Sequence, residues 1–152
     1  MHERRPEFFI IDILIAIDKI RRNTEGLKFE KFLSKEGAVD LTMRNLEIIG
    51  EAANQLLKYP DFLNKTDIEW RKIVNFRNIA IHFYFGIDFD IVFHGIVKKN
   101  IPQLEKDLLD FIKQKKDKTY FLYAIEDAKA DLEEMHRSES VAYLSKIENK
   151  IS

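Results

Sequence analysis

Apolar residues recur with the period of an α-helix along most of this chain, and few residues interrupt the pattern. The 152 residues include only five glycines and three prolines, the two residue types that most often break a helix. Apolar residues make up 45% of the chain and charged residues 34%, which suits helices with one buried face and one solvated face. The sequence therefore predicts an all-α protein without a sheet, folded as an up-and-down helical bundle.

The expected helices follow from apolar periodicity and from residues that start or stop helices. Pro6 begins the first helix and Gly26 lies past its end. Thr66 or Asp67 is the expected N-cap of the helix that ends by Gly86. The expected ranges are 6–23, 29–34, 39–59, 67–85 and 88–112, with two further helices in 119–152.

Two more signals shape the second half of the chain. Asp88 can cap the helix that follows it, and Pro102 is expected to kink or split that helix. The basic, polar stretch 113–118 interrupts the helical pattern. We therefore expect one helical bundle over residues 1–116 and a helical C-terminal extension of unknown role over residues 117–152. An apolar stripe is expected on the extension, made by Tyr120, Tyr123, Ala124, Ala128, Leu132 and Met135.

The first predicted helix is apolar nearly all round, with Asp12 and Asp18 among its few polar residues. A helix of this kind is buried on more than one side. It forms either a subunit interface or the central core helix of the bundle, and the pattern alone leaves both open. The apolar run is too short to span a bilayer, and no signal peptide is visible. With no cysteine, the chain fits a reducing compartment, and we expect a cytoplasmic protein.

Arg77 lies in the apolar face of the helix expected over 67–85. A buried and unpaired guanidinium is costly, so Arg77 must meet a carboxylate, a phosphate or a water-filled cleft. Glu47 and Glu51, on the preceding long helix, are candidates to neutralise it from across the bundle. The alternative is that both glutamates belong to a solvated helix edge and support nothing.

Most catalytic chemistries lack their residues here. The four histidines show no metal-ligand spacing, and neither a glycine-rich phosphate loop nor a nucleophile elbow is present. We therefore expect neither a metal nor a cofactor. The remaining pair with a division of labour is Arg77, which can bind a phosphate, and His82, which can move a proton near neutral pH. RNA cleavage through its own 2′-OH needs only these two functions.

The spacing of the two residues limits how they can act together. Five helical residues place Arg77 and His82 about 140° apart, whereas Asn78 and His82 share a face. The site is therefore expected to be a cleft that the helix edge enters, between two subunits. Each residue also has a structural interpretation: Arg77 as an ion pair, His82 as a polar surface residue and Tyr84 as a core tyrosine.

The pattern Arg77-x4-His82-x-Tyr84 resembles the signature of the HEPN superfamily, and within it the HepT-like toxin group. Three flanking segments, 12–20, 45–53 and 84–88, agree with it in order, and the resemblance runs from about Phe9 to Ile112. It implies a metal-independent endoribonuclease that acts as a homodimer.

The resemblance also implies site roles and partners. Arg77 would stabilise the phosphate, His82 would handle the proton and Asn78 would orient the site. Proteins of this group are toxins paired with a nucleotidyltransferase antitoxin, which can transfer AMP to the motif tyrosine, here Tyr84. The alternative is a non-catalytic HEPN module that binds a nucleotide or a nucleotidyltransferase partner, and a purely structural helical dimer is a third option. With a net charge of −1, any RNA binding must come from a local cleft.

Overall fold

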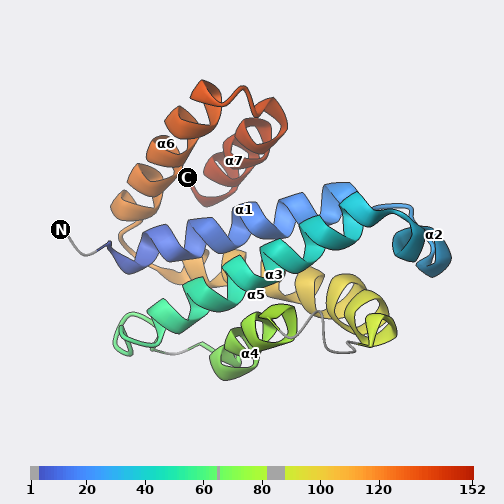
Figure 1. The fold of residues 1–152 in the computed structure, drawn as a ribbon. Helices are drawn as coiled ribbons and strands as arrows, with labels where there is room; N and C mark the ends of the chain where they lie inside the picture. The colour runs from blue at the N-terminus through green and yellow to red at the C-terminus, as the bar shows by residue number, and fades with distance from the viewer. Residues whose placement is uncertain (1–3, 65, 82–87) are drawn as a thin grey trace.

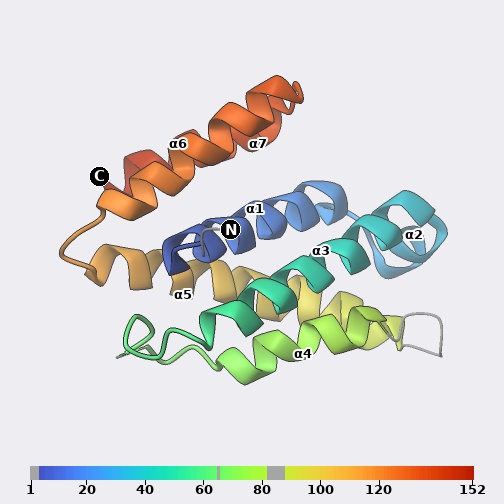
Figure 2. The same cartoon turned by 60° about the vertical axis from the view of Figure 1, so that its left-hand side comes forward.

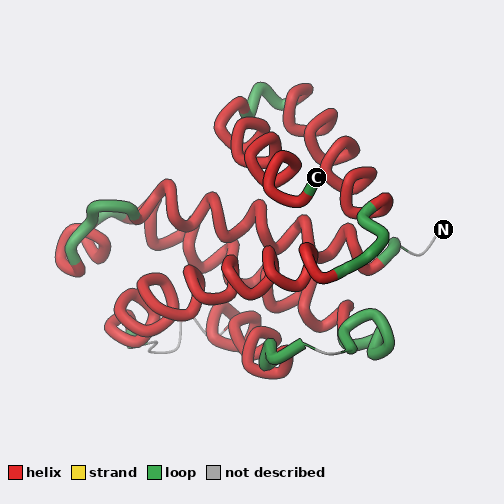
Figure 3. Tube along the Cα trace, turned by 180° about the vertical axis from the view of Figure 1, so that it is seen from behind, coloured by secondary structure: helices red, strands yellow, loops and turns green. Residues whose placement is uncertain are grey.

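The computed structural model describes residues 4–64, 66–81 and 88–152, and every regular element within them is a helix. Figure 1 shows the helices stacked around one long central helix, and Figure 3 shows the same arrangement from behind. The prediction of an all-α bundle is confirmed. The elements are α1 (Pro6–Thr24), α2 (Phe29–Ser34), α3 (Glu36–Leu56), α4 (Trp70–Ile81), the π-helix η2 (Ile91–Asn100), α5 (Ile101–Gln114), α6 (Thr119–Glu134) and α7 (Ser138–Ile151).

Helix α1 lies at the centre of the fold. It packs against α3, α5, α6, α7 and η2, and in Figure 2 it lies between the α6–α7 pair and the layer of α3 and α5. Its apolar residues, such as Ile10, Leu14, Ile17 and Ile20, are buried within the chain itself. The near-continuous apolar circumference of α1 is therefore used by the core of a single chain. None of the helices in the described residues is both long and apolar enough to cross a membrane.

Two helix boundaries differ from the prediction. Helix α3 starts at Glu36 and ends at Leu56, three residues earlier at each end than expected. Helix α4 starts at Trp70, because the Thr66 hydroxyl accepts a local hydrogen bond from the Ile68 N–H (3.2 Å) and forms a turn. Neither Thr66 nor Asp67 therefore caps the helix. The expected end of this helix at Gly86 lies outside the described residues.

The signal at Asp88 has the expected effect, whereas Pro102 does not split the helix that contains it. The Asp88 carboxylate accepts a hydrogen bond from the Asp90 N–H (3.0 Å), as a capping residue does. Pro102 lies in the first turn of α5, directly after η2. Proline cannot donate to the carbonyl four residues earlier, and the helix changes from the π to the α pattern beside it without a break in the helical backbone.

The C-terminal extension packs firmly on the bundle. Helices α6 and α7 pack on each other and both contact α1. Arg22 of α1 donates to Glu139 (2.7 Å) and to Ser140 (3.0 Å) of α7. The predicted apolar stripe of α6 was partly wrong: Tyr120, Tyr123 and Met135 are exposed. The face that packs inward consists of Phe121, Ala124, Ile125 and Leu132.

Candidate functional site

Arg77 of α4 forms an ion pair with Glu51 of α3. Its Nη1 atom donates to Glu51 Oε2 at 2.8 Å. The Arg77 side chain is 31% exposed and that of Glu51 is 51% exposed, so the pair lies at the mouth of the α3–α4 interface. Of the two carboxylates considered from the sequence, Glu51 makes this contact, whereas Glu47 pairs with Arg44 on its own helix (3.2 Å).

The two helices meet unusually closely at this point because α3 carries a glycine there. A methyl group placed on Gly50 would overlap the backbone of Arg77, with the Arg77 Cα only 2.8 Å away. Real Cβ atoms do not approach other heavy atoms this closely. Gly50 therefore allows the backbone of Arg77 to lie directly against α3. At this position the Arg77 guanidinium reaches the carboxylate of Glu51, the residue next to Gly50.

One donor of Arg77 is not used by any residue that the structure describes. Its Nε atom is buried and has no hydrogen-bond partner among the described residues. An unsatisfied buried donor on a cation is costly unless something occupies it. The buried Nε atom is not open to solvent, so only the exposed part of the guanidinium, on a side chain that is 31% exposed, can meet a second anion such as a phosphate.

The Glu51 carboxylate is kept ionised by its neighbours. The hydrogen bond from Arg77 lowers the pKa of Glu51 below its ordinary value, and a hydrogen bond from Gln55 Nε2 (3.3 Å) lowers it further. Burial acts in the opposite direction. Glu51 is therefore negative at neutral pH and orients Arg77.

Asn78 lies one residue further along α4, exposed, and its side-chain Nδ2 donates to Asn75 Oδ1 (3.2 Å). Asn78 is therefore a surface residue whose amide nitrogen is held by its own helix. His82 and Tyr84, the other two predicted site residues, lie outside the described residues. The structure thus brings Arg77 and Glu51 together and leaves Glu47 apart from them.

Three residues of this region were not identified from the sequence. Gly50 positions Arg77, Gln55 supports Glu51, and Asn75 holds Asn78. A glycine in the middle of a long helix is unfavourable by itself, so Gly50 was the one available signal for a close helix contact. Gln55 lies four residues after Glu51 and Asn75 three before Asn78, spacings that place side chains together on a helix.

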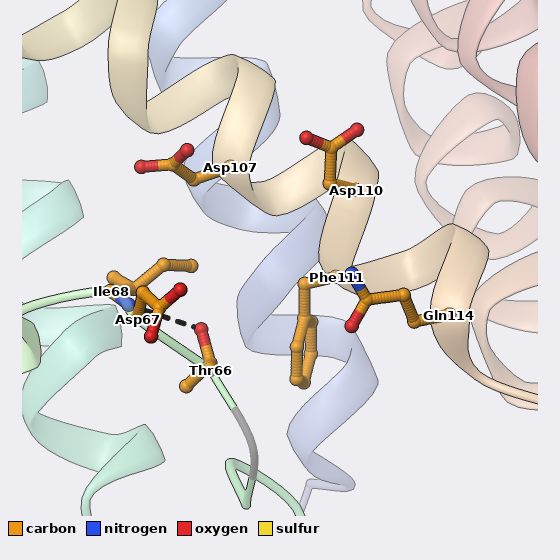
Figure 4. A pocket seen from close by; sticks show the side chains of 7 residues that line it. All are labelled: Thr66, Asp67, Ile68, Asp107, Asp110, Phe111 and Gln114. Atoms are coloured by element: carbon orange, nitrogen blue, oxygen red, sulfur yellow. Dashed lines mark hydrogen bonds between the residues drawn. The ribbon is translucent and has the colours of Figure 1, made fainter.

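A pocket elsewhere on the protein, away from the Arg77–Glu51 pair, is unsuited to a polyanion. It lies between the segment before α4 and helix α5, has a volume of about 130 Å³, and three aspartates line it: Asp67, Asp107 and Asp110 (Figure 4). The negative lining would repel phosphate. Within the described residues, no group of three or more histidine or acidic side chains is arranged to hold a metal ion.

Comparison with known proteins agrees with the family resemblance of the sequence. The family model described as "Ribonuclease HepT-like" matches residues 13–111. A protein of Methanocaldococcus jannaschii named as a putative RNase is 34% identical over 109 residues, which cover 71% of this chain and 97% of that protein. A protein of Thermococcus cleftensis named "Probable ribonuclease HepT" is 35% identical over 104 residues, 68% of this chain and 92% of its own length. No solved structure gives a significant match.

The all-α bundle and the family match together define the class of this protein. The chain belongs to the HepT-like ribonuclease family, and the enzyme class expected from the sequence, an endoribonuclease, is the class of that family. A putative RNase of Caldanaerobacter subterraneus subsp. tengcongensis is covered over 99% of its length by 74% of this chain. About a quarter of this chain therefore lies beyond such relatives, and the family model ends at residue 111, ahead of α6 and α7.

Proposed function

We propose that this protein is a metal-independent endoribonuclease that cleaves RNA by transesterification. The 2′-OH of the ribose loses its proton and attacks the adjacent phosphorus, while the bond from phosphorus to the 5′-oxygen breaks. The leaving 5′-oxygen takes up a proton, and the products are a 2′,3′-cyclic phosphate and a free 5′-OH. Such a reaction needs a proton-transfer group and a cation that stabilises the phosphate, and it needs no redox step.

The observation that carries the proposal is the state of Arg77. Its Nη1 atom is fixed by Glu51, and its side chain is 31% exposed, so the guanidinium is held in place and can be reached from solution. An arginine that is oriented in advance and accessible is suited to stabilise charge on a phosphate during the reaction. In this assignment Arg77 binds the phosphate, His82 transfers the proton and Asn78 orients the substrate.

The active form is proposed to be a homodimer with the site at the interface between the two copies. Ile81, at the end of α4, is 53% exposed, and Ile91, at the start of η2, is 60% exposed. Large exposed aliphatic side chains beside a proposed site suit a surface that a partner covers. The sequence suggested α1 for this role, but the chain's own helices bury α1, so we propose the surface around Ile81 and Ile91.

The biological role we propose is that of a toxin controlled by a nucleotidyltransferase antitoxin in the cytoplasm. Transfer of AMP to the hydroxyl of Tyr84, with release of pyrophosphate from ATP, would add a negative phosphodiester near Arg77. This charge would compete with the RNA phosphate for the guanidinium and so lower activity.

Cleavage of total RNA by the purified protein in EDTA tests the proposed function. We expect cleavage by the unaltered chain and a loss of at least about 100-fold in Arg77→Ala and His82→Ala, the usual effect of removing a charge-stabilising or proton-transfer group. Arg71→Ala is the matched control, since Arg71 is exposed on the same helix.

The outcomes separate the alternatives. Full cleavage by His82→Ala would remove the catalytic assignment. Absence of cleavage by the unaltered protein, together with binding of a nucleotide or of the nucleotidyltransferase, would favour the non-catalytic HEPN module instead. Absence of both would leave the structural dimer.

A further inference from the structure

The C-terminal extension, which lies beyond the end of the family match at residue 111, completes a groove on the bundle. The groove has a volume of about 640 Å³ and lies between α1, α3 and the turn that joins α6 to α7. Four cationic side chains and a single carboxylate line it. Its charged lining residues are Lys19 and Arg22 of α1, Arg44 of α3, and Arg137 and Glu139 beside and within α7.

Two of these cations have no carboxylate partner. Arg22 is held by Asp18 (2.8 Å) and Glu139, and Arg44 by Glu47, but neither Lys19 nor Arg137 lies within ion-pair distance of an acidic group in the described structure. Burial lowers the pKa of the Lys19 ammonium below its ordinary value, and the positive charges of Arg137 and Arg22 lower it further. Cations that lie close together with no anion between them repel each other, and this favours the binding of an anion from solution.

A buried polar atom in the same groove also lacks a partner. Asn45 lines the groove and is only 4% exposed. Its Nδ2 donates to the carbonyl of Leu41 (2.8 Å), which fixes the amide orientation, and its Oδ1 accepts no hydrogen bond from any described residue. The site thus offers an acceptor for a hydroxyl beside the cations that would hold a phosphate.

The turn between α6 and α7 directs both Arg137 and the start of α7 toward the groove. The Arg137 N–H bonds the Leu132 carbonyl (2.9 Å) and the His136 N–H bonds that of Glu133 (3.0 Å), the pattern that ends a helix with a left-handed residue. His136 is that residue, with φ of 58°. Helix α7 then begins at Ser138 with no side-chain cap, so its first N–H groups face an anion site without a protein acceptor.

The groove adjoins a second groove that extends along α3 toward the partner of Arg77. One stripe of α3 lines both this groove and a neighbouring one of about 260 Å³, and Arg44 belongs to both. Three carboxylates line the second groove, those of Asp12, Glu47 and Glu51. Unlike the aspartates of the pocket in Figure 4, each is paired with an arginine within the described residues: Arg4, Arg44 and Arg77, respectively. From Glu51 to Asn45 the helix rises by about 9 Å, so the two ends of the path are close enough for one short strand.

We propose that this groove binds the sugar–phosphate backbone of the single-stranded RNA substrate on one side of the cleaved bond. Lys19, Arg137 and the start of α7 hold a phosphate, and Asn45 Oδ1 accepts a hydrogen bond from a ribose 2′-OH. The inference rests on the proposed ribonuclease function for the identity of the substrate. It assigns the extension a role in substrate binding and not in the chemical step.

Binding is measured by fluorescence anisotropy with a single-stranded RNA of about 12 nucleotides. The full chain carries His82→Ala and the buffer contains EDTA, so that cleavage does not interfere. We expect Lys19→Gln and Arg137→Gln each to weaken binding at least threefold. The slope of log K against log salt concentration should become less steep by about 0.7, the value for one lost phosphate contact on a single strand. Lys146→Gln is the matched control, because Lys146 is exposed on α7 and does not line the groove.

The same assay separates the possible failures. Unchanged binding in both variants would overturn the proposal, whether or not the unaltered protein cleaves RNA. Loss of binding in both variants supports the groove even if no cleavage is found, which would then count against the proposed function alone. DNA of the same sequence that binds as tightly as RNA would overturn the contact between Asn45 and the 2′-OH. A polyglutamate peptide that competes as well as RNA would assign the groove to an acidic protein.

Discussion

Gly50 of α3 and Arg77 of α4 touch through their backbones, and no side chain fits between them. Gly50→Ala should therefore force the two helices apart and lower the free energy of unfolding by about 1–3 kcal/mol, the usual cost of overpacking. With Arg77 in its proposed role, a displacement of about 1 Å should reduce the cleavage rate by about 100-fold. Urea unfolding and the RNA cleavage assay measure the two effects.

Gly37→Ala is the control for this substitution. Gly37 lies in the same helix, and nothing lies within 4 Å of the Cβ that it would gain. The free energy of unfolding of the Gly37→Ala variant should stay the same or rise by up to about 1 kcal/mol, since alanine favours a helix more than glycine does. Equal stability losses in the two variants would mean that the loss comes from α3 itself and not from its contact with Arg77.

The Arg77–Glu51 pair should make a small, pH-dependent contribution to stability. Arg77 lowers the pKa of Glu51 in the folded chain below the ordinary value of 4.5. A carboxyl whose pKa is lowered on folding stabilises the fold above its unfolded pKa, and this contribution is lost as the pH falls through the folded pKa. Glu51→Gln should therefore lower the free energy of unfolding at pH 7 by no more than about 1 kcal/mol, because the pair is half exposed.

Urea unfolding of both proteins between pH 7 and pH 3 measures this contribution. The difference between them should begin to shrink near pH 4.5 and disappear below the folded pKa of Glu51, which lies under that value. It should also shrink at high salt, which screens exposed charges. A constant difference across the whole pH range would indicate that Glu51 acts through packing and not through its charge.

The proposed dimer surface can be tested by placing charge on it. Ile81→Arg and Ile91→Arg should each shift the protein from dimer to monomer in light scattering at micromolar concentration, because an unpaired charge cannot be buried in an interface. Tyr123→Arg is the control: Tyr123 is also 60% exposed but lies on α6, in the extension. A dimer that survives both isoleucine substitutions would place the interface elsewhere.

Much of the fold was predictable because it depends on local signals. Apolar periodicity predicted the helices, and Asp88 predicted a helix cap. Pro102 marked the place where the helix changes from the π to the α pattern. The start of α4 was missed because the Thr66 hydroxyl forms a local turn instead of capping the helix. Capping residues and turn residues are the same residue types, so sequence alone does not separate the two roles.

The site was predictable only in part, because it depends on how helices cross. An arginine in an apolar face needed a partner, but Glu47 and Glu51 were equivalent by spacing. The close approach at Gly50 decides that Arg77 meets Glu51. The basic groove joins Lys19, Arg44 and Arg137, which are distant in the sequence, and a net charge of −1 gave no sign of it.

Tyr84 is the predicted acceptor of AMP, although it lies outside the described residues. Co-expression with a nucleotidyltransferase encoded beside the gene should give an adenylate mass shift in the unaltered chain and none in Tyr84→Phe. The Tyr84→Phe variant should cleave RNA at the normal rate and escape inhibition. The substitution removes the hydroxyl that accepts AMP, so no adenylate competes with RNA for Arg77. Intact-mass spectrometry and the cleavage assay measure both.

The tyrosines of the extension provide the control for this prediction. Tyr120 and Tyr123 are 39% and 60% exposed, so their hydroxyls are accessible to a modifying enzyme. Both lie on α6, which α1 separates from the α4 helix of Arg77 (Figures 1 and 2), so AMP on either one would not compete directly with RNA for the guanidinium. A mass shift that persists in Tyr84→Phe and disappears in Tyr120→Phe or Tyr123→Phe would move the acceptor to the extension. If the unaltered chain shows no mass shift either, the nucleotidyltransferase would have to inhibit RNA cleavage by binding alone.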